Sequence, residues 1–572
     1  MAVTKMFGAA VKRREDPRLI TGHGYYTDDV SLPGQTYMAI LRSPYGHARI
    51  RSIDTSKAKM HPGVVAVFTG EDTSNGGLSP LPCAWPLPKE TLEGGEPMPI
   101  PVWHSLAVGK VRYTGDGVAA VIAESPAIAK DALDLIDVDY EPLPAVTDQE
   151  KALEPGAPQL HDNVPNNQAF HWMLHAGDID AAFSQADRVV KQRLVNTRLI
   201  PNPMETHSIL ASWNPGSEEM TVWNTSQNPH VTRLLTTLTT GIPEHRLRVI
   251  ARDVGGGFGA KISLYPGDAV AIWASKKLSR PVKWTEERRE NYLATAHGRD
   301  HIQYVEWAVK NDGTILGLRV KAVANMGAYV QSGPGAGVPT WLFAPMLSGC
   351  YKIGAIHCDV FGAYTDTVPT DAYRGAGRPE ATYLVERGVD AIANELGMSP
   401  IDVRRKNFIQ ADEFPYAAVT TFVYDSGNYN GALDKALEIV GYEKLRQEQA
   451  EARKQGRYIG IGFSTYVEVC GLGPSAGANA IGFGGGLWES ATVRISATGK
   501  VTVLTGTSPH GQGEETTFAQ IVSSELGVPV DDVDVVHGDT GAVQMGMGTY
   551  GSRGLAVGGA ALVVAARKVR EQ

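Results

Sequence analysis

The residues best suited to chemistry in this sequence lie in four short stretches rich in glycine. They are D-V-G-G-G-F-G-A-K at 253–261, D-A-Y-R-G-A-G-R at 371–378, S-P-H-G-Q-G-E-E at 508–515 and G-M-G-T-Y-G-S-R-G at 546–554. Glycine has no Cβ and tolerates positive φ, so such loops bend sharply and let the backbone approach a ligand closely. The amide, guanidinium and hydroxyl groups among the glycines can hydrogen-bond to a polar or anionic group. We expect the fold to bring these loops to one bulky ligand.

Three side chains in these loops stand out, and each has a plainer alternative. Arg374 and Arg378 lie four residues apart, and planar guanidinium groups suit two-pronged contacts with a phosphate or an oxo-anion. The alternative is that they form salt bridges between domains. Gln512 lies between Gly511 and Gly513, where its amide can donate and accept toward a ligand. The alternative for this glutamine is an ordinary turn residue.

The first loop also satisfies the G-x-G-x-x-A pattern of dinucleotide-binding folds, through Gly255, Gly257 and Ala260. A strand-like run precedes it and a helical pattern follows, as that fold requires. The acidic residue expected at the end of the next strand is missing, because Glu286 and Glu287 come late and in a charged run. An NAD-dependent dehydrogenase is therefore the weaker alternative.

Composition limits the class of protein. The chain has 572 residues, enough for two to four domains, with 62 acidic against 53 basic residues. This excess argues against a nucleic-acid partner, and no apolar run is long enough to span a bilayer. The apolar stretch at 7–11 is too short for a signal peptide, so we expect the cytoplasm. Cys83, Cys350, Cys358 and Cys470 form no C-x-x-C pair, so we expect free thiols, and any electrons must leave through another subunit.

The loops depend on regular elements beside them. Strand-like residues 249–254 lead into the first loop, and residues 268–278 have helical apolar spacing after it. A strand, a glycine loop and a helix in this order suit an anion, because loop and helix amides converge on it. Helices are predicted at 381–396, after the second loop, and at 516–526, after the third. Residues 1–150 predict a compact α+β domain in which we expect no chemistry.

The last third of the chain contains two further helical patterns. The many charges at 432–455 predict one surface helix. Residues 556–570 begin another helix, and there the sequence stops. A domain rarely finishes in the middle of a strong helical pattern, so we expect the chain to be cut short or completed by another polypeptide.

Several longer motifs, taken in order, resemble one protein family. They start with R-R-E-D-P-R-L-I-T-G-H-G-Y-Y-T-D-D at 13–29, V-R-Y-T-G-D-G-V-A-A-V-I-A at 111–123 and N-T-S-Q-N-P-H at 224–230, and the glycine loops follow. Over essentially its whole length the chain resembles the large, molybdopterin-bearing subunit of the xanthine dehydrogenase and aldehyde oxidase family of molybdenum hydroxylases. It most resembles the cysteine-free form of the carbon monoxide dehydrogenase large-subunit branch.

The resemblance implies a multidomain α+β fold. An N-terminal α/β hammerhead domain at 1–150 and a linker at 151–167 would come first. Two molybdopterin-binding α+β domains would follow at 168–415 and 416–572, the second of them incomplete at its C-terminal end. The family's catalytic base, a glutamate in a late G-E motif, would lie beyond Gln572.

The resemblance also implies site residues. Gln227, Phe258 and Arg374 would border the molybdenum and act in catalysis, while the pterin dithiolene, and no protein side chain, would hold the metal. Glu514 and Glu515 are not substitutes for the base, because we expect these first-turn carboxylates to stabilise a helix N-terminus. The residues implied to bind the cofactor are Gly256, Gly257, Phe258, Ala372, Arg374, Gly511, Gln512, Gly513, Thr549, Ser552 and Arg553.

Two departures from the family pattern bear on the substrate. Gly375 and Ala376 replace the cysteine and serine of an A-Y-R-C-S-F-R loop, so the sulfur bridge to copper is missing, which argues against carbon monoxide oxidation. Ile262 stands where purine-oxidising relatives have a substrate-binding glutamate, which argues against xanthine. The implied reaction hydroxylates the electrophilic C–H carbon of an aldehyde or an aromatic N-heterocycle with water. The alternative is a truncated or split cofactor-binding scaffold that is inactive alone.

Cofactors and partners also follow from the resemblance. Molybdenum would be bound by molybdopterin, in its cytosine dinucleotide form. Electrons would pass to [2Fe-2S] clusters on a small subunit and then to FAD on a medium subunit. The assembly would be a dimer of heterotrimers, and if the chain is split a second polypeptide would supply the missing C-terminal stretch.

Overall fold

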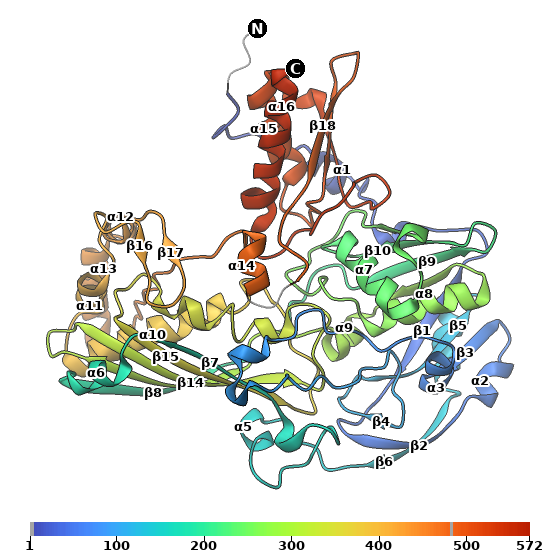
Figure 1. The fold of residues 1–572 in the computed structure, drawn as a ribbon, viewed down its shortest axis with the longest axis horizontal. Helices are drawn as coiled ribbons and strands as arrows, with labels where there is room; N and C mark the ends of the chain where they lie inside the picture. Colours follow the sequence, from blue (N-terminus) through green and yellow to red (C-terminus); the bar gives the residue numbers. More distant parts are fainter. Residues whose placement is uncertain (1–4, 481–483) are drawn as a thin grey trace.

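The structure is a computed structural model that describes residues 5–480 and 484–572. Figure 1 shows a five-stranded sheet with its helices on the left, a seven-stranded sheet with its helices on the right, and the last elements of the chain rising above their junction. The α+β multidomain class predicted from the sequence is confirmed.

The helices are α1 (Asp16–Ile20), α2 (Ser56–Met60), α3 (Gly70–Asn75), α4 (Pro126–Leu133), α5 (Gln149–Ala152), α6 (Ile179–Ser184), α7 (Pro229–Thr240), α8 (Pro266–Leu278), α9 (Arg288–Ala294), α10 (Arg378–Leu396), α11 (Pro400–Asn407), α12 (Tyr429–Val440), α13 (Tyr442–Lys454), α14 (Ser475–Ala480), α15 (Glu514–Leu526) and α16 (Ala560–Glu571).

The seven-stranded sheet takes strands from both sides of the predicted linker at 151–167. Its order is β11 (Leu247–Ile250), β10 (Glu219–Asn224), β9 (Ser208–Asn214), β12 (Val282–Thr285), β1 (Thr36–Arg42), β5 (Gly117–Ala123) and β3 (Val64–Thr69). β1 pairs antiparallel with β5 and parallel with β12, which comes much later in the chain. Every residue of β5 is buried, because apolar clusters cover both of its faces.

The five-stranded sheet forms the largest continuous part of the core. Its order is β7 (Gln168–Ala176), β15 (Ala355–Tyr364), β14 (Ile315–Gly327), β13 (His301–Val309) and β8 (Arg188–Asn196). All neighbours are antiparallel except β14 and β15. α10 packs on β13 and β8, and the indole of Trp307 fills the space that a Cβ would occupy at Gly388. This packing fixes α10, which begins where the second glycine loop ends.

Glycine decides where several helices end. α7, α10 and α15 end at Gly241, Gly397 and Gly527, each with a positive φ that lets the chain turn away without a Cβ penalty. The single helix predicted at 432–455 is wrong, because Gly441, with φ of 63°, separates α12 from α13. The helix predicted from residue 556 begins as α16 only after a π-helical turn. In the described part of the chain, no helix combines the length and apolar character needed to cross a bilayer.

The last part of the chain packs against its beginning. A sheet of β18 (Ala491–Ile495), β19 (Val501–Thr505) and β20 (Val533–Val536) shares an apolar core with α15 and α16. Residues 5–20, here called the N-terminal segment, lie beside these helices (Figure 1). Met6 N donates to Ser524 Oγ at 2.9 Å, and Arg14 N donates to Thr516 Oγ1 at 2.8 Å. The N-terminal segment therefore connects the last elements to the seven-stranded sheet. The short strands that remain are β2 (Ala48–Asp54), β4 (Lys110–Val111), β6 (Asp137–Pro142), β16 (Tyr416–Ala417) and β17 (Val423–Tyr424).

Candidate functional site

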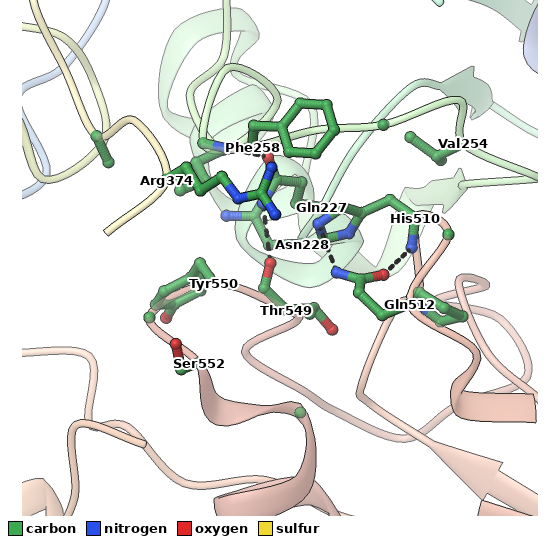
Figure 2. A pocket seen from close by; sticks show the side chains of 18 of the residues that line it. Gln227, Asn228, Val254, Phe258, Arg374, His510, Gln512, Thr549, Tyr550 and Ser552 are labelled. Atoms are coloured by element: carbon green, nitrogen blue, oxygen red, sulfur yellow. Dashed lines mark hydrogen bonds between the residues drawn. The ribbon is translucent and has the colours of Figure 1, made fainter. Parts of the chain in front are cut away.

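All four glycine loops line one cavity of about 1200 Å³. This volume exceeds the usual range of about 300–1000 Å³ for small-molecule sites, so the cavity can hold an extended ligand. Figure 2 shows Phe258 and Arg374 on one side of it, with His510 and Gln512 on another and Tyr550 below. The fold thus brings together loops that lie as much as 300 residues apart in the sequence.

Gln227 ties the first loop to the fourth. Its Oε1 accepts hydrogen bonds from the backbone N–H groups of Gly259 (2.9 Å) and Lys261 (3.3 Å), and its Nε2 donates to the carbonyl oxygen of Thr549 (2.9 Å). This pattern fixes the orientation of the amide. A Cβ at Gly257 would overlap the amide oxygen of Gln227, and Gly257 is not among the residues that line the cavity. The missing Cβ of Gly257 therefore makes room for Gln227, which does line the cavity.

Phe258 and Arg374 form the contact between the first and second loops. The Arg374 guanidinium lies 5.5 Å from the centre of the Phe258 ring, and Arg374 N donates to the Phe258 carbonyl oxygen at 2.8 Å. A Cβ at Gly259 would overlap the carbonyl oxygen of Ala372, so the two loops touch through their backbones. Among the described residues this guanidinium takes part in no ion pair, unlike its neighbour Arg378. Its charge is therefore available to a ligand.

Two other arginines hold the second loop in place. Arg299 donates from Nη1 to the carbonyl oxygen of Tyr373 and from Nη2 to that of Arg374, both at 2.7 Å. Arg378 is buried, and its Nε lies 2.6 Å from the carboxylate of Glu468, in a segment beyond the loop. Arg378 thus forms the interdomain salt bridge that the sequence left open as the alternative. No local pattern pointed to Arg299, because its contacts lie about 75 residues further along the chain.

His510 and Gln512 support each other in the third loop. Gln512 Oε1 accepts from the backbone N–H of His510 at 2.7 Å, and its Nε2 lies 2.7 Å from Nε2 of His510. Burial lowers the pKa of His510 to about 4, so at pH 7 the ring is neutral and its Nε2 accepts the amide proton. Gly511 and Gly513, with φ of 115° and 92°, give the loop a course that a residue with a Cβ rarely adopts. Gln512 therefore presents an amide edge of fixed orientation to the cavity.

The fourth loop places its three predicted residues differently. Thr549 and Ser552 line the cavity, and Thr549 Oγ1 accepts from the backbone N–H of Ser508 at 3.1 Å. Arg553 is not among the lining residues. Its fully buried guanidinium lies 2.8 Å from Glu489 and donates to three backbone carbonyl groups. The structure therefore corrects the expected position of Arg553, because this buried charge is already paired within the last domain.

Three buried polar atoms on the cavity wall have neither a hydrogen-bond partner nor an ion-pair partner in the described parts of the chain. They are Nδ2 of Asn228, Oε2 of Glu514 and Nδ1 of His537. Buried polar groups are usually paired, and a ligand that supplies donors and acceptors would complete these three atoms. Their positions fit a ligand that carries both donors and acceptors along its length.

The N-terminal segment also contributes to the cavity, although no chemistry was expected in the first 150 residues. Arg13 and Arg18 both line it. Arg18 pairs with Asp253 at the start of the first loop, and its Nη2 lies 2.9 Å from Glu515 at the start of α15. The structure therefore brings this segment to the cavity, and its signal in the sequence was the density of charge at 13–18.

One wall of the cavity is apolar. A buried cluster forms there from Ile262, Val338, Leu342, Ala372 and Ala376, with Leu472 and Tyr550 packed against it. Ile262 offers only hydrocarbon to a ligand on this wall. The wall suits an uncharged, apolar part of a ligand, whereas the glycine loops suit a polar part.

Metal-ligating clusters and reactive thiols are not features of this cavity. Within residues 5–480 and 484–572, no group of three or more His, Cys, Asp or Glu side chains is placed to hold a metal ion. Cys83, Cys350, Cys358 and Cys470 are free, and none of them lines the cavity. Burial raises the pKa of Cys350 to about 12, which keeps it a thiol. The cavity therefore offers hydrogen bonds and charge to its ligand.

Models of three protein domains match most of the chain. Residues 21–144 match the a/b hammerhead domain of aldehyde oxidase and xanthine dehydrogenase. Residues 160–408 and 435–572 each match a molybdopterin cofactor-binding domain, and these two matches contain all four glycine loops. The predicted order of a hammerhead domain followed by two molybdopterin-binding domains is confirmed.

Alignments with several named proteins extend over nearly the whole chain. The carbon monoxide dehydrogenase large chain of Afipia carboxidovorans is 41% identical over 98% of this chain and 70% of its own length. The nicotine 6-hydroxylase large subunit of Paenarthrobacter nicotinovorans is 36% identical over 99% of this chain and 68% of its own. Quinoline 2-oxidoreductase from Pseudomonas putida 86 has a TM-score of 0.94 at 36% identity, covering 100% of this chain and 71% of that one. The chain therefore belongs to the xanthine dehydrogenase and aldehyde oxidase family of molybdenum hydroxylases, as a large subunit that binds molybdopterin.

Proposed function

We propose that this subunit binds molybdopterin as the cytosine dinucleotide and hydroxylates an aromatic N-heterocycle, with aldehydes as a second substrate class. Substrate and water give the hydroxylated product, two protons and two electrons. When bound, the cofactor supplies the two-electron sink of this reaction. The residues of the chain bind the cofactor, orient the substrate and exclude water.

The observation that carries the proposal is the meeting of four glycine loops and three unpaired polar atoms at one cavity of about 1200 Å³. A pterin with a nucleotide tail is long and polar, and it carries donors and acceptors along its edges. Gln512, between two glycines of positive φ, has the amide and the open backbone that would hold a pterin edge. Thr549 and Ser552 offer hydroxyl groups to its phosphate.

Arg374 is proposed as the catalytic group at the other end of the cavity. Its guanidinium carries no ion pair among the described residues and lies over the Phe258 ring. A positive charge held there would stabilise negative charge that develops on the reacting substrate. Gln227 is proposed to keep the first loop in place and to direct its remaining amide N–H to the cavity.

The apolar wall supports an uncharged aromatic substrate. Ile262 and Leu342 give a ring a hydrocarbon surface. Gly375 and Ala376 carry no thiol, which disfavours the copper-dependent oxidation of carbon monoxide. The names of two relatives point the same way, because nicotine and quinoline are both aromatic N-heterocycles.

The proposal includes partners that take the electrons away. The chain has four cysteines and no C-x-x-C pair, so we expect [2Fe-2S] clusters on a small subunit and FAD on a medium subunit, in a dimer of heterotrimers. The words "large chain" and "large subunit" in the names of two relatives support a complex of several chains.

The test starts with the complex purified from its native host. Molybdenum, copper, pterin and cytidine monophosphate are measured per large subunit, and the co-purifying chains are identified. We expect near-stoichiometric molybdenum, pterin and nucleotide without copper. A complex that lacks molybdenum and pterin would refute the cofactor assignment.

The site assignment is tested on the same complex with Arg374→Ala. We expect quinoline hydroxylation to fall by about tenfold or more, because charge stabilisation in the reaction is lost, while the melting temperature stays within about a degree of the wild type. Arg51→Ala removes a surface arginine far from the cavity and is the control. Wild-type turnover in Arg374→Ala would exclude it from the reaction.

A further inference from the structure

Glu514, at the start of α15, carries the one buried carboxylate oxygen on the cavity wall that has no hydrogen-bond partner among the described residues. It is 7% exposed, and its Oε2 accepts no hydrogen bond. The other carboxyl groups there are engaged. Glu515 pairs with Arg18 at 2.9 Å, Asp253 pairs with the same arginine, and Glu15 accepts from Thr516. The unpaired oxygen of Glu514 is therefore available to a ligand in the cavity.

The charge of this wall decides which part of a ligand fits it. Glu15, Asp253, Glu514 and Glu515 line it, against two arginines, of which Arg18 is already paired with two of these carboxylates. A phosphate would be repelled here, because like charges at short range in a poorly solvated site are unfavourable. A neutral heterocycle with an amino group would be favoured, because it brings donors to unpaired acceptors.

The neighbouring His537 supports a ligand of this kind. Its Nε2 lies 3.4 Å from Glu515 Oε1, while its Nδ1 is buried and unpaired on the same wall. Burial raises the pKa of Glu514, so its carboxyl group can carry a proton and act as donor and acceptor together. Two unpaired groups on the same wall call for a ligand with at least two polar atoms.

We propose that Glu514 binds the amino-bearing edge of a heterocycle of the cofactor, and so fixes the position of the cofactor in the cavity. This inference rests on the proposed function. Two edges have the right chemistry. The pterin edge has an amino group beside a ring N–H, two donors that need two acceptors. The cytosine edge has an amino group beside an unprotonated ring nitrogen, one donor and one acceptor.

Two substitutions of Glu514 separate these edges. Glu514→Gln keeps the shape and offers one acceptor and one donor, so it can still bind a cytosine edge but not a pterin edge. Glu514→Ala removes both contacts and fits the first turn of a helix. The holo-complex of each variant is dialysed, and the molybdenum, pterin and cytidine monophosphate that remain are followed with time.

We expect the cofactor to leave Glu514→Ala about tenfold faster or more than wild type. If Glu514→Gln holds it as wild type does, the edge is that of cytosine. If Glu514→Gln loses it as fast as Glu514→Ala, the edge is that of the pterin. Retention within twofold of wild type in Glu514→Ala overturns the proposal.

A second measurement separates this role from a structural one. After the cofactor is removed, Glu514→Ala should melt close to the wild-type temperature, because the loss of a favourable first-turn charge and the relief of an unpaired buried oxygen offset each other. A lower melting temperature would mean that Glu514 is structural and would overturn the proposal. Glu525→Gln removes a charge from the other end of α15, where Arg567 and Arg570 pair with it, and is the control. If the wild-type complex contains no molybdenum or pterin, the proposed function itself fails and this inference falls with it.

Discussion

Several residues that line the cavity also hold one another in position through hydrogen bonds and packing. Gln227 uses both atoms of its amide within the protein, and Gly257 leaves the space that this side chain fills. The pattern in the sequence marks Gly257 as part of a glycine-rich loop, but it does not show which neighbour needs the missing Cβ. The shape of the first loop therefore depends on this pair.

We expect Gly257→Ala to displace the first loop, because the new Cβ would overlap Oε1 of Gln227. Overpacking of this kind typically costs about 1–3 kcal/mol of stability. Thermal unfolding of the purified complex measures this loss, and metal analysis should show a parallel loss of molybdenum. Gly462→Ala is the matched control, since a Cβ there meets nothing within 4 Å. Unchanged melting and metal content in Gly257→Ala would contradict this account.

His207, behind the first loop, should make stability depend on pH. Burial lowers its pKa from 6.5 to about 3, so below pH 6.5 the unfolded chain takes up a proton that the folded protein does not. The stability tied to neutral His207 is present above pH 6.5 and lost as the pH falls, by about 2 kcal/mol at pH 5. Melting curves between pH 7 and 5 should therefore fall less steeply for His207→Gln. His245→Gln, on the surface, controls for the loss of a histidine, and parallel curves for wild type and His207→Gln would refute the prediction.

The sequence predicted the loop residues better than their roles. Arg374, Arg378 and Arg553 have the same signature, a guanidinium group among glycines. Arg378 pairs with Glu468, and Arg553 pairs with Glu489. Each glutamate lies 64 or more residues away from its arginine along the chain. A local pattern cannot separate a free arginine from a paired one, because the partner comes from another segment.

At the scale of elements, the N-terminal segment closes one side of the cavity. Arg18 reaches the first loop through Asp253 and the third loop through Glu515. Gln520 also donates to backbone carbonyl groups of this segment. An element held by a few polar contacts opens more readily than a packed strand does.

We expect Arg18→Ala to loosen the N-terminal segment. Thermolysin should cleave within residues 5–20 several times faster in the variant than in the wild type, because two of its attachments are lost. Dialysis of the holo-complex should also release molybdenum faster. Arg51→Ala, which loses only a surface ion pair with Glu141, should behave as wild type. Equal cleavage rates in Arg18→Ala and wild type would show that other contacts hold the segment.

Elements defined by local physics were predicted well, and those defined by distant contacts were not. The ends of α10 and α15 follow from single glycines, which the sequence shows directly. The pairing of β1 with β12 was not predicted, because the apolar pattern of a strand does not indicate which other strand pairs with it. The contact between the N-terminal segment and α15 was missed for the same reason, because it joins residues that lie far apart in the sequence.

For the whole molecule, the cavity is the place where three groups of elements meet. Loops from the first molybdopterin-binding match, loops from the second and the N-terminal segment all line it. A ligand held by all three stabilises their arrangement, because binding to the folded state alone shifts the equilibrium toward it.

We expect removal of the cofactor to loosen the molecule unevenly. Hydrogen exchange in α15, in the fourth loop and in residues 5–20 should speed up by about tenfold or more, whereas β13 and β14, deep in the five-stranded sheet, should change little. Mass spectrometry of loaded and emptied wild-type complex measures both. A uniform change across the chain would contradict this distribution.

The parallel pairing of β1 with β12 also bears on how the chain is made. Thr36 is synthesised long before its partner Val282, roughly ten to fifty seconds earlier at about 5–20 residues per second. During that time β1 can pair with β5, but its other edge stays open. An open, apolar strand edge recruits other chains. The centre of the seven-stranded sheet is therefore the part of the nascent protein that stays open to such pairing until residue 285 has emerged.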